Sequence, residues 1–305
     1  MTLILTVNGP ETIWLLADRR LSFPDRPPRD DARKVMFLET TDGVAILGYA
    51  GLGATALGTE PADWMSAVLR GRNLPLEQSL AALAEALKRQ LPRHLLRIAG
   101  TGPLAHNVFI PAFLGREARL YTIDLVFPPD RQSYAFRYTR QVVERPGLAT
   151  PSTPRIGLAG SGTRYLARDT RWVRRLLRMM RAHDRGQVPA HAVADHLAAL
   201  NNEVHLCDKS VGPRCIVAWR HRKGGVHNGG GADQFYTGAT RDTSSSGLPI
   251  IGCGMDVRAL LDFMTPRWMK QFEAMRAGQP ALEWDKDEIN TELAQLPDKP
   301  DEHLR

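Results

Sequence analysis

The order of strand-like and helix-like segments restricts the fold of this chain more than any other feature of its sequence. Short β-rich runs come first, and the spacing of apolar residues then changes from about two to about 3.6. The change recurs further along, so the full order is strands, two helices, strands, two helices, strands. Runs of strands separated by runs of helices favour an α+β fold over an alternating parallel one. A four-layer αββα sandwich accommodates this order, with two antiparallel sheets between two pairs of helices.

The start of the chain predicts two β-hairpins. Strands are expected over 2–7 and 12–17, joined by the turn sequence Asn-Gly-Pro-Glu. Strands over 34–39 and 44–49 pair across a connection that ends in Asp-Gly, a strong hairpin signal. Later strands are expected over 107–114, 119–126, 134–143, 155–159 and 214–220.

Helical spacing of apolar residues occurs over 53–70 and 76–98, and again from about residue 163 and over about 189–203. The helix that begins near residue 163 carries an arginine at every third or fourth position, namely Arg164, Arg168, Arg171, Arg175 and Arg178. This basic stripe predicts a solvated outer face. Contact with an acidic partner subunit or with a polyanion is the alternative.

The C-terminal part of the sequence differs in composition from the rest. Residues 224–254 are rich in glycine, serine and threonine, which predicts a flexible loop. A last helix is expected over about 257–277. We therefore expect a main domain over residues 1–228 and a C-terminal extension over 229–305.

Composition narrows the class of protein. With 305 residues, 43% of them hydrophobic and 24% charged, the chain can bury a full core. No stretch approaches the roughly 20 apolar residues of a membrane span. Three cysteines form an odd and sparse set, which favours reduced thiols and a cytoplasmic protein. The net charge of +7 invites a nucleic-acid hypothesis, but no nucleic-acid-binding motif accompanies it, so such a partner is not expected.

Thr2 is the residue with the most distinctive chemical potential. If Met1 is removed, Thr2 carries a nucleophilic hydroxyl and a free α-amine on one residue. An α-amine with a pKa of about 7.7–8.0 in model peptides is well suited to accept the hydroxyl proton. A nearby lysine ammonium would lower that pKa, and a carboxylate would orient the lysine. Asp18 and Lys34 would lie at adjacent strand ends if the hairpins pair as predicted.

The spacing of Thr2, Asp18, Arg20, Lys34 and Gly48 resembles that of proteasome β-type subunits and their bacterial relatives, the N-terminal-nucleophile (Ntn) threonine hydrolases. The resemblance covers about residues 2–228 and implies the αββα fold of that family. It also implies roles. Thr2 would attack a carbonyl carbon, Lys34 would tune the amine, Asp18 would hold Lys34, and the Gly48 N–H would form the oxyanion hole.

Two later segments extend the resemblance. Gly160-Ser161-Gly162 at a strand-to-helix junction is similar to the Gly-Ser-Gly of the family, whose serine hydrogen-bonds near the amine of the nucleophile. Asp208 and Ser210 lie where the family places an aspartate and a serine that support the threonine. The resemblance implies a peptide or protein substrate, a ring of identical subunits, no cofactor and no membrane. An unfoldase partner is left open.

Two alternatives to a threonine peptidase stay open at this stage. The chain could be a catalytically silent scaffold that assembles through the basic helix and the C-terminal extension, or a non-proteolytic Ntn amidohydrolase. A zinc site is not expected, because the candidate ligands His205, Cys207, Cys215 and His221 lack a CxxC or HxxxH unit. Cys253 is interpreted as a packed small residue.

Overall fold

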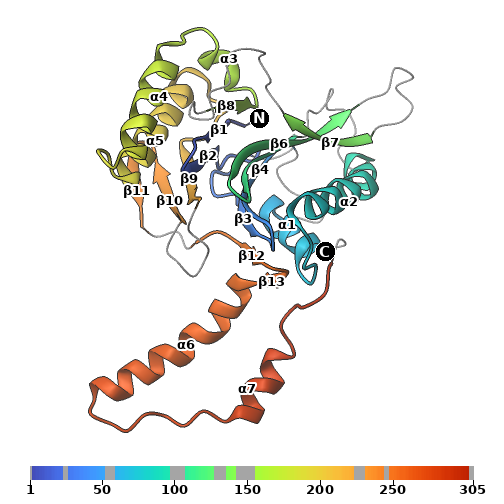
Figure 1. Cartoon of the computed structure of the whole chain (residues 1–305), viewed down its shortest axis with the longest axis vertical. Coiled ribbons are helices and arrows are strands. Elements are labelled where there is room, and N and C mark those ends of the chain that lie inside the picture. Colours follow the sequence, from blue (N-terminus) through green and yellow to red (C-terminus); the bar gives the residue numbers. More distant parts are fainter. Residues whose placement is uncertain are drawn as a thin grey trace.

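The computed structural model of the chain contains two β-sheets that pack face to face between two layers of helices (Figure 1). The structure describes residues 2–22, 27–51, 59–96, 107–126, 135–141, 155–222, 231–243 and 247–301. This architecture confirms the predicted α+β class and the four-layer αββα sandwich.

The first sheet contains the N-terminal hairpin at its centre. Its six strands follow the spatial order β11-β10-β9-β2-β1-β8 and pair antiparallel throughout. The strands are β1 (Ile4–Asn8), β2 (Thr12–Asp18), β8 (Arg155–Ala159), β9 (Arg214–His221), β10 (Gly231–Thr237) and β11 (Thr240–Asp242).

The second sheet has seven strands in the order β13-β12-β3-β4-β5-β6-β7. One pair, β12 with β3, is parallel, and the others are antiparallel. The strands are β3 (Val35–Glu39), β4 (Gly43–Ala50), β5 (Asn107–Leu114), β6 (Glu117–Val126), β7 (Ala135–Gln141), β12 (Ile250–Gly252) and β13 (Met255–Asp256).

Helices cover the outer face of each sheet. The second sheet carries α1 (Pro61–Leu69) and α2 (Leu76–Leu96), and the first carries α3 (Thr163–Leu166), α4 (Arg171–Asp184) and α5 (Ala190–Cys207). Two further helices, α6 (Val257–Arg276) and α7 (Lys286–Leu293), follow the last strand.

Three apolar layers hold the sandwich together. The middle layer lies between the sheets and contains Ile4, Leu15 and Phe37. Because side chains alternate along a strand, the neighbouring Leu5 points to the other face, into the layer beneath α4 and α5. A third layer lies between the second sheet and α1 and α2. Strands buried on both faces read as continuous apolar runs, which is why the N-terminal strands were detectable from the sequence.

The flexible loop predicted over 224–254 requires correction. Part of this segment forms β10 and β11, which extend the first sheet, and β12, which joins the second. The reason is packing: Phe235 is buried between the sheets, and Tyr236 is buried beneath the helices on the opposite face. The hydrophobic burial of these aromatic residues outweighs a composition rich in glycine and threonine.

Several element boundaries also differ from the prediction. The basic helix is divided into α3 and α4, because the chain turns between residues 167 and 170. The helix expected over 53–70 begins at Pro61, a favourable first helical residue, and residues 52–58 lie outside the described residues. Most of the loop between 127 and 154 lies outside them as well.

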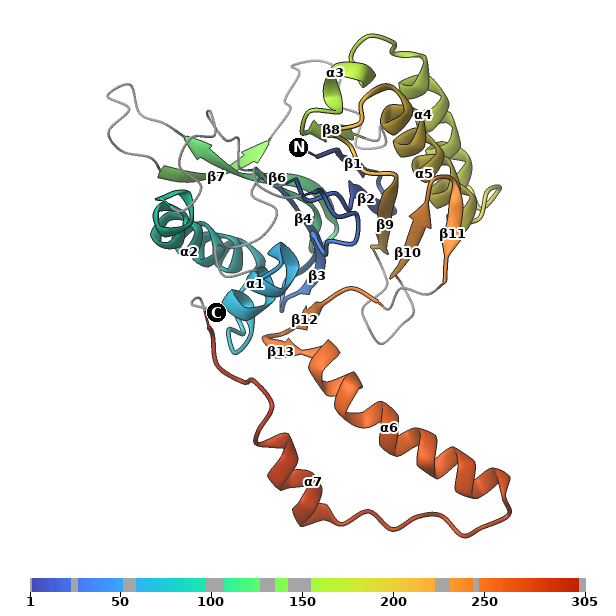
Figure 2. The ribbon, with the colours of Figure 1, turned by 180° about the vertical axis from the view of Figure 1, so that it is seen from behind.

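The C-terminal helices form an arm that leaves the sandwich after β13 and returns to it (Figures 1 and 2). The returning end is fixed to α1, where the Asp301 N–H donates to the Ala67 carbonyl at 2.8 Å. The Arg70 Nε–H donates to the Lys299 carbonyl at 2.8 Å. Among the described residues, none of the helices is both long enough and apolar enough to cross a membrane.

We predict that Phe235→Ala lowers the free energy of unfolding by about 3 kcal/mol, because it leaves a cavity between the sheets. Chemical denaturation monitored by circular dichroism measures this change. Thr240→Ala, at an exposed position of β11, is the matched control and should change stability by less than about 0.5 kcal/mol. If Phe235→Ala lowered the free energy of unfolding no more than Thr240→Ala does, the segment would be a loop, as the sequence predicted.

Candidate active site

Thr2, Asp18 and Lys34 come together at one edge of the sandwich, although they belong to different sheets. Thr2 precedes β1, and Asp18 ends β2 in the first sheet, whereas Lys34 precedes β3 in the second. The Lys34 ammonium Nζ donates to Thr2 Oγ1 at 2.5 Å. All three residues are buried, with 5% of Thr2, none of Asp18 and 3% of Lys34 exposed. The sequence-based prediction placed these residues at neighbouring strand ends, and the structure brings them into contact.

Lys34 has an acceptor for each of its three ammonium protons. Besides Thr2 Oγ1, its Nζ donates to Asp18 Oδ1 at 3.2 Å and to the Arg20 carbonyl at 2.6 Å. Burial lowers the pKa of the Lys34 amine, and the neighbouring Asp18 carboxylate opposes that shift. The geometry therefore presents a desolvated cation to the threonine hydroxyl.

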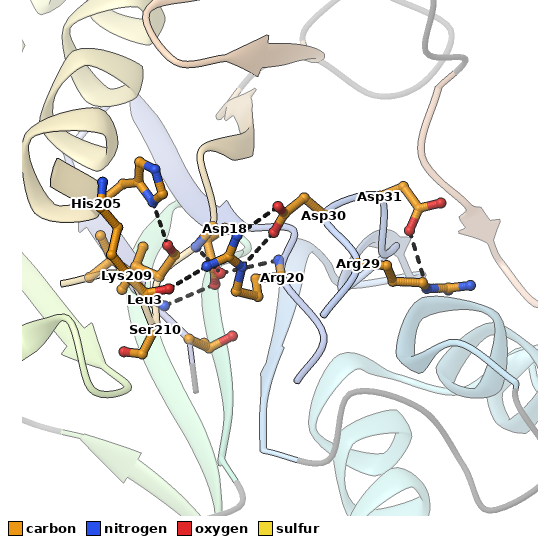
Figure 3. A network of polar contacts seen from close by, with 12 residues as sticks. Leu3, Asp18, Arg20, Arg29, Asp30, Asp31, His205, Lys209 and Ser210 are labelled. Carbon is orange, nitrogen blue, oxygen red and sulfur yellow. Dashed lines mark hydrogen bonds and ion pairs between the residues drawn. The ribbon is translucent and has the colours of Figure 1, made fainter. Parts of the chain in front are cut away.

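Asp18 is held by four hydrogen-bond donors. Its Oδ1 accepts from the Leu3 N–H at 2.9 Å and from Lys34, and its Oδ2 accepts from the N–H groups of Arg20 at 3.2 Å and Gly212 at 3.0 Å. Figure 3 shows Asp18 between Leu3 and Arg20. A buried carboxylate is stable only when its oxygens are satisfied in this way. Asp18 is thus fixed in the orientation that holds Lys34.

The register of the first hairpin explains why these groups meet. Ile4 pairs with Ala17, and the Asp18 N–H donates to the Leu3 carbonyl at 3.0 Å. Leu3 and Asp18 come one residue beyond the Ile4–Ala17 pair, and Thr2 comes next to Leu3, so Thr2 and Asp18 lie at the same end of the first sheet. Lys34 reaches them from the second sheet, so the site depends on how the two sheets are packed.

The predicted Gly160-Ser161-Gly162 segment passes directly over the backbone of Thr2. Gly160 adopts a φ of +89°, and a Cβ at this position would overlap with the Thr2 carbonyl oxygen. The Gly162 N–H donates to that same carbonyl at 3.5 Å. Only glycine meets both requirements at position 160, the left-handed backbone and the close approach.

Ser161 and Ser210 are joined by a hydrogen bond of 3.0 Å between their hydroxyls. The Ser210 N–H donates to Asp208 Oδ1 at 2.9 Å, and hydrogen bonding by Ser210 lowers the pKa of the Asp208 carboxyl. The three residues therefore form one polar chain that reaches the segment lying over Thr2. Asp208 lies at the end of this chain, away from Ser161.

Arg20 connects Lys34 to the loop between α5 and β9 that contains Ser210 (residues 208–213, the serine loop), a role that the sequence did not indicate. Its guanidinium forms two bonds with Asp30, from Nε to Oδ1 at 2.7 Å and from NH2 to Oδ2 at 2.8 Å. It also donates to the Lys209 carbonyl (Figure 3). The Arg20 carbonyl accepts from Lys34. The hydrogen bond with Asp30 raises the pKa of Arg20. A bidentate pair of this kind fixes the orientation of both side chains.

Asp30 is the site residue that sequence analysis missed. It lies in the polar, proline-rich loop between β2 and β3, where no pattern distinguishes it from the other acidic residues. A Cβ at Gly212 would lie 2.8 Å from Asp30 Oδ1 and 2.8 Å from Arg20 Cβ. The glycine therefore lets the serine loop pack directly against this ion pair.

Gly48 of β4 pairs with Val35 of β3, which is the residue that follows Lys34. The Tyr49 N–H donates to the Lys34 carbonyl at 2.9 Å, and N–H directions alternate along an antiparallel strand. The Gly48 N–H is consequently directed to β5, where Gly48 pairs with Phe109. A Cβ at Gly48 would lie 2.7 Å from the Leu15 side chain, so the glycine permits close packing of the sheets. Its role in an oxyanion hole stays a prediction.

The remaining candidates do not form a second site. Among the residues that the structure describes, no group of three histidine, cysteine, aspartate or glutamate side chains could hold a metal ion. The His205 Nδ1 is hydrogen-bonded to the Val211 carbonyl at 2.8 Å, and burial raises the pKa of the Cys215 thiol. Cys207 is exposed. Cys253, expected to be packed, is also exposed and adopts a φ of +49° in the β12–β13 turn.

No family model matches the chain, and neither does any curated protein. The chain is similar in structure to Anbu proteins, at low sequence identity. The helical assembly of the Anbu complex from Pseudomonas aeruginosa is 15% identical, with a TM-score of 0.49, over 92% of this chain and 98% of that chain. Anbu, ancestral beta-subunit, from Yersinia bercovieri is 13% identical, with a TM-score of 0.44, over 93% and 100%. A Gly-1 mutant of Anbu from Hyphomicrobium sp. strain MC1 is 12% identical, with a TM-score of 0.45, over 93% and 100%.

We predict that Gly160→Ala destabilises the protein by more than about 2 kcal/mol, because the methyl group would displace the Thr2 backbone in addition to straining φ. Gly186→Ala is the matched control, since Gly186 has a φ of +72° and open space around it. Its cost should be about 1 kcal/mol. Thermal denaturation of both variants separates the two effects, and equal losses would contradict the close approach to Thr2.

Proposed function

We propose that this protein is an Ntn hydrolase that cleaves amide bonds in peptides or proteins, with Thr2 as its nucleophile after removal of Met1. One observation carries the proposal: a buried ammonium, Lys34, donates to the Thr2 hydroxyl at 2.5 Å and is itself anchored on the buried Asp18. A cation placed at a hydroxyl stabilises the negative charge that develops on oxygen as the proton leaves.

The reaction follows from these groups. The free α-amine of Thr2 accepts the Oγ1 proton while Oγ1 bonds to the substrate carbonyl carbon, and a tetrahedral oxyanion forms. The oxyanion collapses, and the leaving amine takes the proton from the α-ammonium. Water then hydrolyses the acyl ester and restores Thr2. Lys34 remains protonated throughout, and its charge keeps the α-amine neutral and ready to accept a proton.

Ser161, Ser210 and Asp208 have a supporting role in this proposal. Their hydrogen-bond chain ends at the segment that covers the Thr2 backbone, where a newly exposed α-amine would need an acceptor. A positioned amine has a fixed lone pair, which favours proton transfer over solvation by water.

Two backbone N–H groups, those of Gly48 and Gly51, are candidates for the oxyanion hole in this proposal. The Gly48 N–H, predicted from the sequence, would have to leave its pairing with β5. The next N–H that is directed to the β3 side is that of Gly51, which follows the last residue of β4 and is exposed.

Assembly into a cytoplasmic homo-oligomer is the second part of the proposal. Support comes from α6, on which Leu261, Trp268, Phe272 and Met275 are each at least 40% exposed. Apolar surface of this extent marks a contact with another protein. A silent scaffold is the competing function, and it would need the assembly without the chemistry.

The first test is N-terminal mass analysis of the purified chain after incubation with a β-lactone probe. We expect loss of Met1 and one acyl adduct on Thr2, because the hydroxyl is activated by its own amine. Thr2→Ala should abolish labelling, whereas Thr240→Ala should leave it unchanged. Protein that retains Met1 in a host able to remove it would contradict the catalytic proposal and favour the scaffold.

A second test uses the pH dependence of kcat/KM for a fluorogenic peptide. Activity requires a neutral amine and a charged Lys34, so the profile should be bell-shaped. Because burial lowers the pKa of Lys34, the alkaline limb should lie below the ordinary lysine value of about 10.4.

The Asp18→Asn variant tests which group causes the alkaline limb of the pH profile. The Asp18 carboxylate raises the pKa of Lys34, so its removal should move the alkaline limb to lower pH and reduce the rate at least about 10-fold. Asp195→Asn, whose carboxylate pairs with Arg241 on the outer face, is the control and should leave the limb in place. An alkaline limb that does not move in Asp18→Asn would exclude Lys34 as the group that titrates there.

A further inference from the structure

The positive charge of the chain is concentrated on one helix, α4. This helix contains five arginines, Arg171, Arg174, Arg175, Arg178 and Arg181, and one aspartate, Asp184. All five arginines are exposed, while Leu176 and Met180 bury the opposite face. Their spacing of three and four residues places them in one stripe along the helix. Among the described residues, Arg171 pairs with Asp169, and no ion pair neutralises the other four.

Negative charge is concentrated on α7 and the residues just before it. Residues 282–293 contain five carboxylates, Glu283, Asp285, Asp287, Glu288 and Glu292, and a single lysine. Glu283, Asp285, Asp287 and Glu288 are exposed, and Asp285 caps the helix by accepting from the Asp287 N–H at 2.8 Å. Glu292 pairs with Arg267 of α6. The net charge of α4 is therefore +4, and that of 282–293 is −4.

The two charged segments cannot meet within one chain. The α4 helix covers the outer face of the first sheet, whereas α7 is tied through residues 299–301 to α1, beyond the second sheet. Figures 1 and 2, which share a vertical axis, place α4 at the top of the molecule and α7 at the bottom. A partner for either segment must come from another molecule.

We propose that the acidic segment 282–293 of one copy docks on the arginine stripe of α4 of a second copy. The opposite net charges favour this pairing, and so do the lengths. A helix of 14 residues is about 21 Å long, and the acidic segment, with eight helical residues and four extended ones, spans about 25 Å. Trp284 is 36% exposed within the acidic segment and adds an aromatic face on which a guanidinium can stack.

A contact of this type joins two different surfaces, so a pair of copies retains one free arginine stripe and one free acidic segment. Repetition closes a ring or propagates a helix, depending on the rotation between copies. The contact deepens the assembly part of the proposed function and does not depend on Thr2 being a nucleophile. Its failure and the failure of catalysis are therefore distinguishable.

Paired charge reversals test the contact in the full-length protein. One variant, Arg174→Glu/Arg178→Glu, changes the net charge of α4 from +4 to 0, and the other, Asp287→Lys/Glu288→Lys, changes that of residues 282–293 from −4 to 0. Sedimentation velocity at about 50 mM salt, where screening is weak, should show association of the wild type. Each variant alone should associate at least about 10-fold more weakly, because one of the two facing surfaces then carries no net charge and the attraction between them is lost.

Mixing the two variants is the decisive measurement. The unchanged acidic segment of the first variant has a net charge of −4 and matches the unchanged α4 of the second, with +4, so the mixture should regain association. Regained association also shows that both variants are folded. Lys88→Glu/Arg116→Glu, an equal charge change on the α2 side, is the control and should sediment like the wild type.

Three outcomes would overturn the proposal. The first is a wild type that remains monomeric at low salt, and the second is a mixture that fails to associate. The third is an α4 variant that loses binding to a single-stranded RNA probe while its sedimentation is unchanged, since α4 would then be a polyanion site.

Discussion

The ion pair between Lys34 and Asp18 is the interaction on which the candidate site depends. Burying two charges costs several kcal/mol for each ion unless every donor and acceptor is satisfied. Here the ammonium has three acceptors and the carboxylate has four donors, three of them the backbone N–H groups of Leu3, Arg20 and Gly212. The pair is therefore stable only if the N-terminal hairpin, the packing of the two sheets and the loop after α5 are all in place. Its polar network couples the fold to the site.

The parts of the site that the sequence predicted are those set by local structure. Thr2, Asp18 and Lys34 lie at ends of strands whose apolar runs and turns are readable from the chain. Asp30 and Gly212 are different, because their contact depends on how two distant loops fold back on each other. The register of β4 decides whether the Gly48 N–H is directed to β3 or to β5, and composition carries no information about register. Phe235 and Tyr236 show the same limit at the level of the fold, since burial decided the state of a glycine-rich segment.

Catalyst and scaffold place different demands on Thr2. A scaffold needs only that the first strand be held in its sheet, and an apolar residue of similar size would serve there without a buried charge beside it. The structure instead places a fully desolvated cation against a hydroxyl and presses a left-handed glycine against the backbone of the same residue. A buried cation beside a buried hydroxyl is typical of sites where geometry serves chemistry.

The charged groups of the candidate site are separate from those of the proposed contact between copies. Ionic groups near Thr2 are paired within the sandwich, so they contribute little to the field outside it. The unpaired arginines of α4 and the carboxylates of α7 lie at opposite ends of the molecule, and their attraction is screened over about 10 Å at 0.1 M salt. Salt would consequently weaken contacts between copies while leaving the Lys34–Asp18 pair almost unaffected, because that pair is shielded from solvent. Ionic strength would thus act on the proposed association and on the candidate site to different degrees.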